Sequence, residues 1–161
     1  DVELMKIDIL ATKNAGAHGV VFGVLTPDSK ISFFNKELVS FSKKLGLEVT
    51  FHRAFDFIYD YKTALKTLID YGFDRLLTSG LQETAIKGID VIEEIQKLYG
   101  NTIQIMAGSG VNSKNALKLA ATGIQNLHFT AHKPIGEVTN MSMGELMEVD
   151  KIKIASIMKL F

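Results

Sequence analysis

Five glycines divide this 161-residue chain into segments of similar length. Each glycine follows a stretch with the apolar spacing of a helix and precedes a short apolar run, and successive glycines are about 30, 26, 28 and 23 residues apart. This spacing is close to one βα unit, and glycine just past a helix is the expected left-handed cap. The repeat therefore predicts alternating helices and strands, with breaks at Gly16, Gly46, Gly72, Gly100 and Gly123.

The apolar runs between the helices are short, and most are apolar on both faces, which is typical of strands in a helix-covered parallel sheet. Alternation with helices predicts parallel strands and right-handed crossovers. We expect an α/β fold of the parallel (β/α)8 TIM-barrel type, incomplete, with about five βα units in one domain over residues 1–161; an open sheet is the alternative. The expected strands are Gly19–Leu25, Glu48–His52, Arg75–Thr78, Ile103–Ala107 and Asn126–Thr130.

Helical spacing and capping residues predict the intervening helices. Leu4, Ile7, Leu10 and Ala11 form the expected buried face of the first. The chain opens inside this helix, so we expect either further strands before Asp1 or a partner chain, such as a second copy, to cover the open sheet. The other expected helices run from Asn35 to Leu45, over Tyr61–Tyr71 behind an Asp60 cap, over Thr84–Leu98, over Lys114–Ala121 behind Asn112 or Ser113, and over Glu145–Leu160.

The composition narrows the classes of function. Lys plus Arg and Asp plus Glu are 18 each, so the formal net charge is zero and no basic stripe points to nucleic acid. The chain has no cysteine, which excludes disulfides and thiolate metal sites here. No apolar run approaches the roughly 20 residues that span a bilayer. We expect no nucleic-acid or membrane partner, and the lack of cysteine is compatible with a reducing cytoplasm.

The stretch from Val49 to Asp56 is the strongest candidate site. It begins as a buried strand and ends with His52, Arg53 and Asp56, where ligands of α/β proteins bind. Because side chains alternate along a strand, and because the outer face should take the larger apolar set (Phe51, Leu77, Leu127 and Phe129), the inner wall near the mouth is expected to carry Thr50, His52, Thr78, His128 and Thr130.

We therefore predict that His52 and His128 face a shared cavity at the carboxyl ends of the strands, with Arg53 and Asp56 on its rim. The four are candidate catalytic residues without assigned roles. Two structural explanations stay open. A single strand histidine is often a hydrogen-bonded core residue, and Arg53 with Asp56 can be an ion pair that pins a loop.

Two glycine-containing turns are candidate anion sites. Gly108, Ser109 and Gly110 follow a strand and open a helix, where glycine admits a ligand to the backbone and free N–H groups attract an anion. Thr78, Ser79 and Gly80 form a weaker version. A tight βα turn needs glycine in any case, so a structural turn is the alternative. Met141, Met143 and Met147 lie close together in the sequence. Their thioethers suit Cu(I), but methionines more often fill gaps in the core.

Several segments resemble the CutC copper-homeostasis family and occur in that family's order: Gly19–Leu25, Phe51–Asp56, Leu76–Gly80, Ile105–Val111 and His128. The resemblance covers nearly the whole chain. It implies a TIM barrel of which strands four to eight are present, and a cytoplasmic protein that binds or handles copper ions. The chain departs from the family at Phe129–Ala131, where Ser-Ser-Ala is commoner, so any role that requires a serine hydroxyl there is in doubt, although Thr130 could substitute.

Two functions stay open at this point. The first is copper binding or handling, with copper as ligand and the metal-binding residues unknown. The second is a TIM-barrel enzyme that acts on a small metabolite, such as a phosphorylated one, at the carboxyl-end pocket around His52 and His128. The lack of cysteine weakens the first, and the lack of an evident active-site lysine or carboxylate pair weakens the second.

Overall fold

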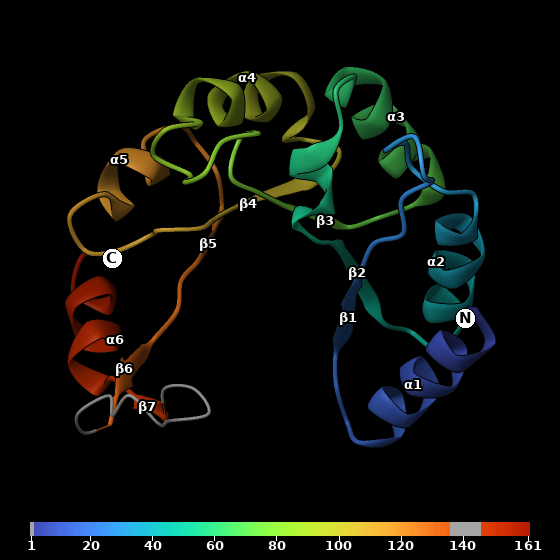
Figure 1. Cartoon of the computed structure of the whole chain (residues 1–161), viewed down its shortest axis with the longest axis horizontal. Coiled ribbons are helices and arrows are strands. Elements are labelled where there is room, and N and C mark those ends of the chain that lie inside the picture. The colour runs from blue at the N-terminus through green and yellow to red at the C-terminus, as the bar shows by residue number, and fades with distance from the viewer. Residues whose placement is uncertain (1, 136–145) are drawn as a thin grey trace.

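The computed structural model describes residues 2–135 and 146–161, which form an open arc of βα units (Figure 1). Five strands build one parallel sheet in chain order, and the helices lie outside the arc. The incomplete barrel-type α/β fold expected from the repeat is confirmed. The strands are β1 (Gly19–Phe22), β2 (Glu48–Phe51), β3 (Arg75–Thr78), β4 (Gln104–Gly108) and β5 (Asn126–His128).

The helices follow the strands as the repeat predicts. A short 3-10 helix, η1 (Arg53–Phe57), also follows β2 directly. A separate antiparallel pair, β6 (His132–Pro134) and β7 (Met147–Val149), lies beyond β5. The α-helices are α1 (Val2–Asn14), α2 (Phe34–Lys44), α3 (Tyr61–Tyr71), α4 (Ile89–Tyr99), α5 (Ala116–Ala120) and α6 (Lys151–Met158).

Local chemistry explains where α3 begins and ends. The Asp60 side chain accepts a hydrogen bond from the Thr63 N–H, and hydrogen bonding to Thr63 lowers the pKa of this carboxyl by favouring its charged form. At the other end Gly72 adopts the left-handed conformation with φ of 88°. Both features agree with the sequence-based prediction. Gly100 does not follow the pattern, because its φ is −60° and α4 ends without a left-handed residue.

Several expected helix boundaries are wrong. Asn35 does not cap α2; its buried side chain bonds the backbone of Val24 instead. The helix expected from Thr84 starts only at Ile89, because Gly80 and Gly88 cross so closely that a Cβ on Gly80 would lie 2.1 Å from the Gly88 oxygen. Residues 147–149, expected to be helical, pair with β6.

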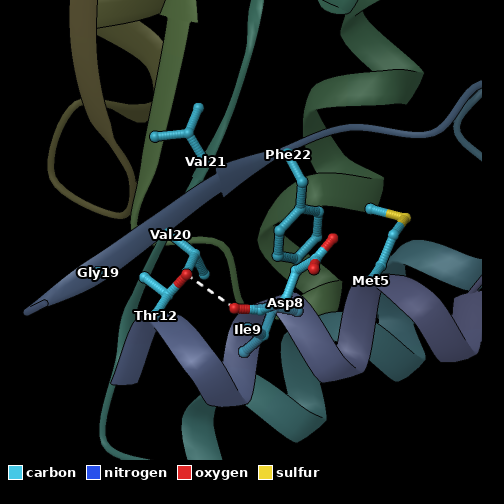
Figure 2. A pocket seen from close by; sticks show the side chains of 8 residues that line it. All are labelled: Met5, Asp8, Ile9, Thr12, Gly19, Val20, Val21 and Phe22. Atoms are coloured by element: carbon cyan, nitrogen blue, oxygen red, sulfur yellow. Dashed lines mark hydrogen bonds between the residues drawn. The ribbon is translucent and has the colours of Figure 1, made fainter. Parts of the chain in front are cut away.

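The predicted buried face of α1 is also wrong. Leu4, Ile7 and Leu10 are exposed, whereas Ile9 is buried. Met5 and Ile9 are among the residues that line a cavity of about 350 Å³ between α1 and β1 (Figure 2). Helical spacing identifies apolar stripes, but the position of the neighbouring strand decides which stripe is covered.

The two faces of the sheet differ sharply in burial. Registered partners point to the same side, so Phe22, Phe51 and Leu76 share the face that packs under the helices and is fully buried. Val21 points to the opposite, inner side of the arc and is 62% exposed; Figure 2 shows it directed away from α1. The hydrophobic core therefore lies between strands and helices, whereas the inner wall is strongly exposed at Val21.

In the described part of the chain, no helix combines the length and the apolar character needed to cross a membrane.

Candidate functional site at the carboxyl ends of the strands

Asp56 is the centre of a hydrogen-bonded cluster between the ends of β2 and β3. Its side chain is only 5% exposed. Arg53 donates from Nε to Oδ2 at 2.8 Å, and the neighbouring turn supplies the other donors. These are Thr78 Oγ1 at 2.5 Å, the Ser79 N–H at 3.1 Å, Ser79 Oγ at 2.9 Å and the Leu81 N–H at 3.3 Å.

The cluster makes Asp56 a positioning residue for the turn after β3. A buried carboxylate is stable only where hydrogen bonds replace the water it loses. The five donor groups come from η1, the end of β3 and the turn, so one side chain holds these segments in register. The ion pair between Arg53 and Asp56, one of the two explanations left open by the sequence, is thereby observed.

Arg53 differs from its partner in exposure. Its side chain is 39% exposed, and its Nη2 donates to the Ser79 hydroxyl at 2.9 Å. Among the described residues Nη1 has no hydrogen-bond partner. Asp56 and Ser79 therefore orient one edge of the guanidinium, and the N–H donors of Nη1 are left for a ligand.

His52 follows the end of β2 and is the residue that caps η1. Its backbone N–H donates to the Phe22 carbonyl at 3.3 Å, and its Nδ1 accepts the Ala54 N–H at 3.2 Å. Its ring lies against that of Phe51, whose side chain is buried on the outer face, so the inner position of His52 stays a prediction.

Thr78 lies on the other face. Its registered partner is Ala107, and both share the buried outer face with Leu76. The predicted inner position of Thr78 and outer position of Leu77 are wrong, because alternation defines two faces without saying which is inner. The Thr78 hydroxyl donates to Asp56 and accepts the Gly80 N–H, so it shapes the turn.

The glycine turn after β4 is largely occupied by its own hydrogen bonds. Ser109 donates its hydroxyl to the Glu83 carbonyl, and the Gly110 carbonyl accepts from the side chains of Asn112 and Asn115. The helix expected over Lys114–Ala121 is the five-residue α5, whose first turn no side chain caps. Anion binding by Gly108, Ser109 and Gly110 stays a prediction, and the short helix weakens it.

Two strands separate His128 in β5 from His52 at the end of β2. His128 registers with Gly108 and is exposed. A Cβ on Gly108 would lie 2.6 Å from Leu77 Cδ1, so the leucine fills the space that the glycine leaves beside His128. With strands about 4.8 Å apart, the two histidine backbones are about 14 Å apart along the sheet. A shared cavity for both stays a prediction. Thr130 lies beyond β5 and is exposed.

A second polar cluster on the inner wall was missed from the sequence. Arg75 donates from Nε and Nη2 to Gln104, from Nη1 to Thr50 and from Nη2 to Glu48, while Asn126 also donates to Gln104. The available signal was that β2, β3, β4 and β5 each begin with a polar residue. The cluster could be recognised only after the strand register showed that these four positions are aligned across the sheet.

Two further features of the chain bear on ligands. A cavity of about 640 Å³ lies outside the mouth, between α3 and the turn at Asp28–Ile31.

Within residues 2–135 and 146–161, no three His, Cys, Asp or Glu side chains lie close enough together to hold a metal ion. Met141 and Met143 fall outside the described residues, and Met147 is half exposed in β7.

Solved structures resemble this arc. A protein from Streptococcus agalactiae, described as a proposed copper homeostasis protein CutC, is 30% identical with a TM-score of 0.70, over 79% of this chain and 62% of that one. A structure described as native KDPGal has a TM-score of 0.64 at 16% identity, over 96% of this chain and 63% of that one, and therefore shows the fold alone.

Sequence relatives point the same way. A CutC family protein of Bacteroides fragilis is 46% identical over 137 residues, and one of Vibrio campbellii is 43% identical over 132 residues. The matches cover 84% and 81% of this chain but 54% and 53% of the relatives, so the chain spans about half of their length. The model of the CutC family matches residues 1–133. From this match and these identities, the chain belongs to the CutC family.

Proposed function

We propose that this protein binds a small anionic ligand, a phosphate or carboxylate, at the carboxyl-end rim around Arg53 and His52. The observation that carries the proposal is the guanidinium of Arg53, which a buried carboxylate orients while 39% of the side chain stays exposed. A planar guanidinium matches two oxygens of a carboxylate or phosphate at once.

The hydrogen bonds of Asp56 leave Arg53 able to attract an anion. Four of the five donor groups on the carboxylate are not the arginine, so the negative charge is spread over the Ser79 turn as well. Orientation before binding lowers the entropy that a ligand has to offset. If the bound ligand reacts, Arg53 holds it, His52 and His128 are the candidates for proton transfer, and Asp56 acts through Arg53.

Titration of the protein with inorganic phosphate and with a small dicarboxylate tests this proposal. We expect saturable amide shifts at Ala54, Ser79 and Gly80 at millimolar ligand, and about tenfold weaker binding in Arg53→Gln, because one charge-assisted contact is lost. Lys62→Gln is the matched control, since it removes one exposed cation that pairs with Glu94 on the outer helices. No saturable shift, or equal weakening in both variants, contradicts the proposal.

Copper binding is the second candidate, and a specific set of side chains favours it. His128 and Met106 lie on the inner wall of neighbouring strands, since their registered partners are Gly108 and Asn126. Imidazole and thioether groups are ligands that copper accepts, and the Streptococcus agalactiae relative is described in terms of copper homeostasis. Both candidate functions are proposed for the cytoplasm, the location that the family resemblance implies.

A Cu(I) titration against a chromophoric chelator separates the two candidates. If copper is the ligand, His128→Ala lowers Cu(I) affinity at least tenfold while Arg53→Gln leaves it unchanged. If the anion is the ligand, Arg53→Gln weakens phosphate binding and His128→Ala leaves it unchanged.

A further inference from the structure

The His52 ring is fixed by contacts on two sides. Its Nδ1 accepts the Ala54 N–H, which caps the first turn of η1. The Phe51 ring lies against it with centroids 5.7 Å apart and an interplanar angle of 63°. On the β1 side, a Cβ on residue 23 would lie 2.8 Å from both Nδ1 and Cε1 of the ring. Gly23 therefore provides the space in which the imidazole sits.

The hydrogen bond at Nδ1 determines the tautomer. A neutral imidazole has one nitrogen that accepts and one that donates. Because Nδ1 accepts from Ala54, the proton of neutral His52 is on Nε2. Among the described residues Nε2 has no hydrogen-bond partner, so this N–H is available to a ligand.

The same hydrogen bond opposes metal binding. A histidine that binds a metal through Nε2 carries its proton on Nδ1 and normally donates it to an acceptor. Here Nδ1 faces the Ala54 N–H at 3.2 Å, so a proton on Nδ1 would place two N–H donors opposite each other. Binding through Nδ1 would instead break the cap and would meet the β1 backbone at Gly23.

We infer that His52 serves the site as a fixed Nε2–H donor to an anionic oxygen, that it is not a metal ligand, and that Gly23 is its positioning residue. The donor role rests on the proposed anion site; the tautomer and the exclusion of metal do not. Copper binding by this protein would then use His128 without His52. The ligand class follows from two donors on residues adjacent in the chain, a guanidinium and an Nε2–H, because phosphate and carboxylate oxygens accept from both.

Long-range 15N NMR of the histidine rings tests the tautomer without any ligand. We expect the His52 Nδ1 signal at the unprotonated position and Nε2 at the protonated one. Added phosphate should shift Nε2, whereas Ag(I), a diamagnetic analogue of Cu(I), should leave both His52 nitrogens in place. A proton on Nδ1 in place of Nε2 overturns the inference. So does a shift of the His52 ring nitrogens that saturates at one equivalent of Ag(I).

Two substitutions at position 52 separate a donor from a merely structural ring. Glutamine carries an N–H donor at nearly the same reach as Nε2, and phenylalanine keeps the ring shape without it. We expect His52→Gln to bind phosphate within about threefold of the wild type and His52→Phe to bind about tenfold more weakly. Equal binding by both variants, with Arg53→Gln still impaired, overturns the donor role and leaves the proposed function intact. Phosphate that fails to bind the wild type contradicts both.

Gly23→Ala tests the positioning role. The new Cβ would meet ring atoms of His52 and Phe51, which are side chains able to turn, so we expect a folded protein with a displaced imidazole. The His52 tautomer should become mixed, and phosphate affinity should fall about fivefold. Val21→Ala, on the exposed inner side of β1 and two residues before Gly23, is the control and should change neither. An unchanged His52 spectrum in Gly23→Ala overturns the role of Gly23.

Discussion

Two arginines, one in η1 at the carboxyl end of the sheet and one at the start of β3, form ion pairs with opposite patterns of exposure. At the carboxyl end Asp56 is 5% exposed and its partner Arg53 is 39% exposed. At the amino end the roles reverse, since Arg75 is 19% exposed and its partner Glu48 is 61% exposed. The buried member of each pair has its hydrogen bonds filled by the fold. We conclude that the hydrogen bonds of Arg75 serve to hold the strands together, whereas Arg53 has N–H donors that a ligand can use.

The largest effect is expected from Asp56→Asn. The amide would direct an N–H2 toward donors that now point at a carboxylate, leaving several buried groups unsatisfied. We expect a loss of about 2 to 3 kcal/mol in the free energy of unfolding. Urea denaturation followed by circular dichroism measures it. A loss below about 0.5 kcal/mol would mean that Asp56 does not hold the turn.

Arg75→Gln should follow. The change removes charge-assisted bonds to Gln104 and Thr50, and Thr50 is buried. We expect about 1 to 2 kcal/mol lower stability and unchanged phosphate binding. Denaturation and phosphate titration of the same sample check both. Weaker phosphate binding in this variant would break the division between a structural and a ligand-binding arginine.

Arg53→Gln should show the reverse profile. Asp56 keeps the donors of Thr78, Ser79 and Leu81, so we expect less than about 1 kcal/mol of destabilisation despite the tenfold weaker phosphate binding expected above. Melting curves with and without phosphate measure the two effects together. A stability loss equal to that of Asp56→Asn would show that the ion pair, and not the turn donors, holds the carboxylate.

The smallest effect is expected from Glu48→Gln. The carboxylate is exposed and 3.3 Å from Arg75 Nη2, and exposed ion pairs contribute little. We expect a change of less than about 0.5 kcal/mol in unfolding free energy, with the other bonds of Arg75 retained. Raising the salt concentration should remove what difference there is. A larger, salt-resistant loss would place Glu48 in the buried network.

Much of the fold was predictable because it depends on short-range chemistry. The Asp60 cap and the left-handed Gly72 each need only a few neighbouring residues, and both were found from the sequence. The helix boundary at residues 84–88 was not, because the approach of Gly80 to Gly88 depends on how the turn folds back. The strand at 147–149 likewise depends on β6, which is distant in the sequence.

The candidate site was likewise predictable only where it depends on residues that are close in the sequence. The position of His52, Arg53 and Asp56 at a strand end was readable from the motif. The inner or outer position of Thr78 was not, because Leu76 and Leu77 are equally apolar and only the register with β4 distinguishes them. The Arg75 network was invisible for the same reason, since its members are far apart in the chain.

By itself, the sequence determined the order and parallel direction of the strands, the glycine breaks and the family, because periodicity and short motifs are local properties. Only the tertiary structure decided which carboxylate is buried, which arginine has free donors and which nitrogen of His52 carries the proton. These depend on hydrogen bonds such as that from the Ala54 N–H to Nδ1 and on the space left at Gly23. Both are fixed by how the chain folds around the site, which no local pattern records.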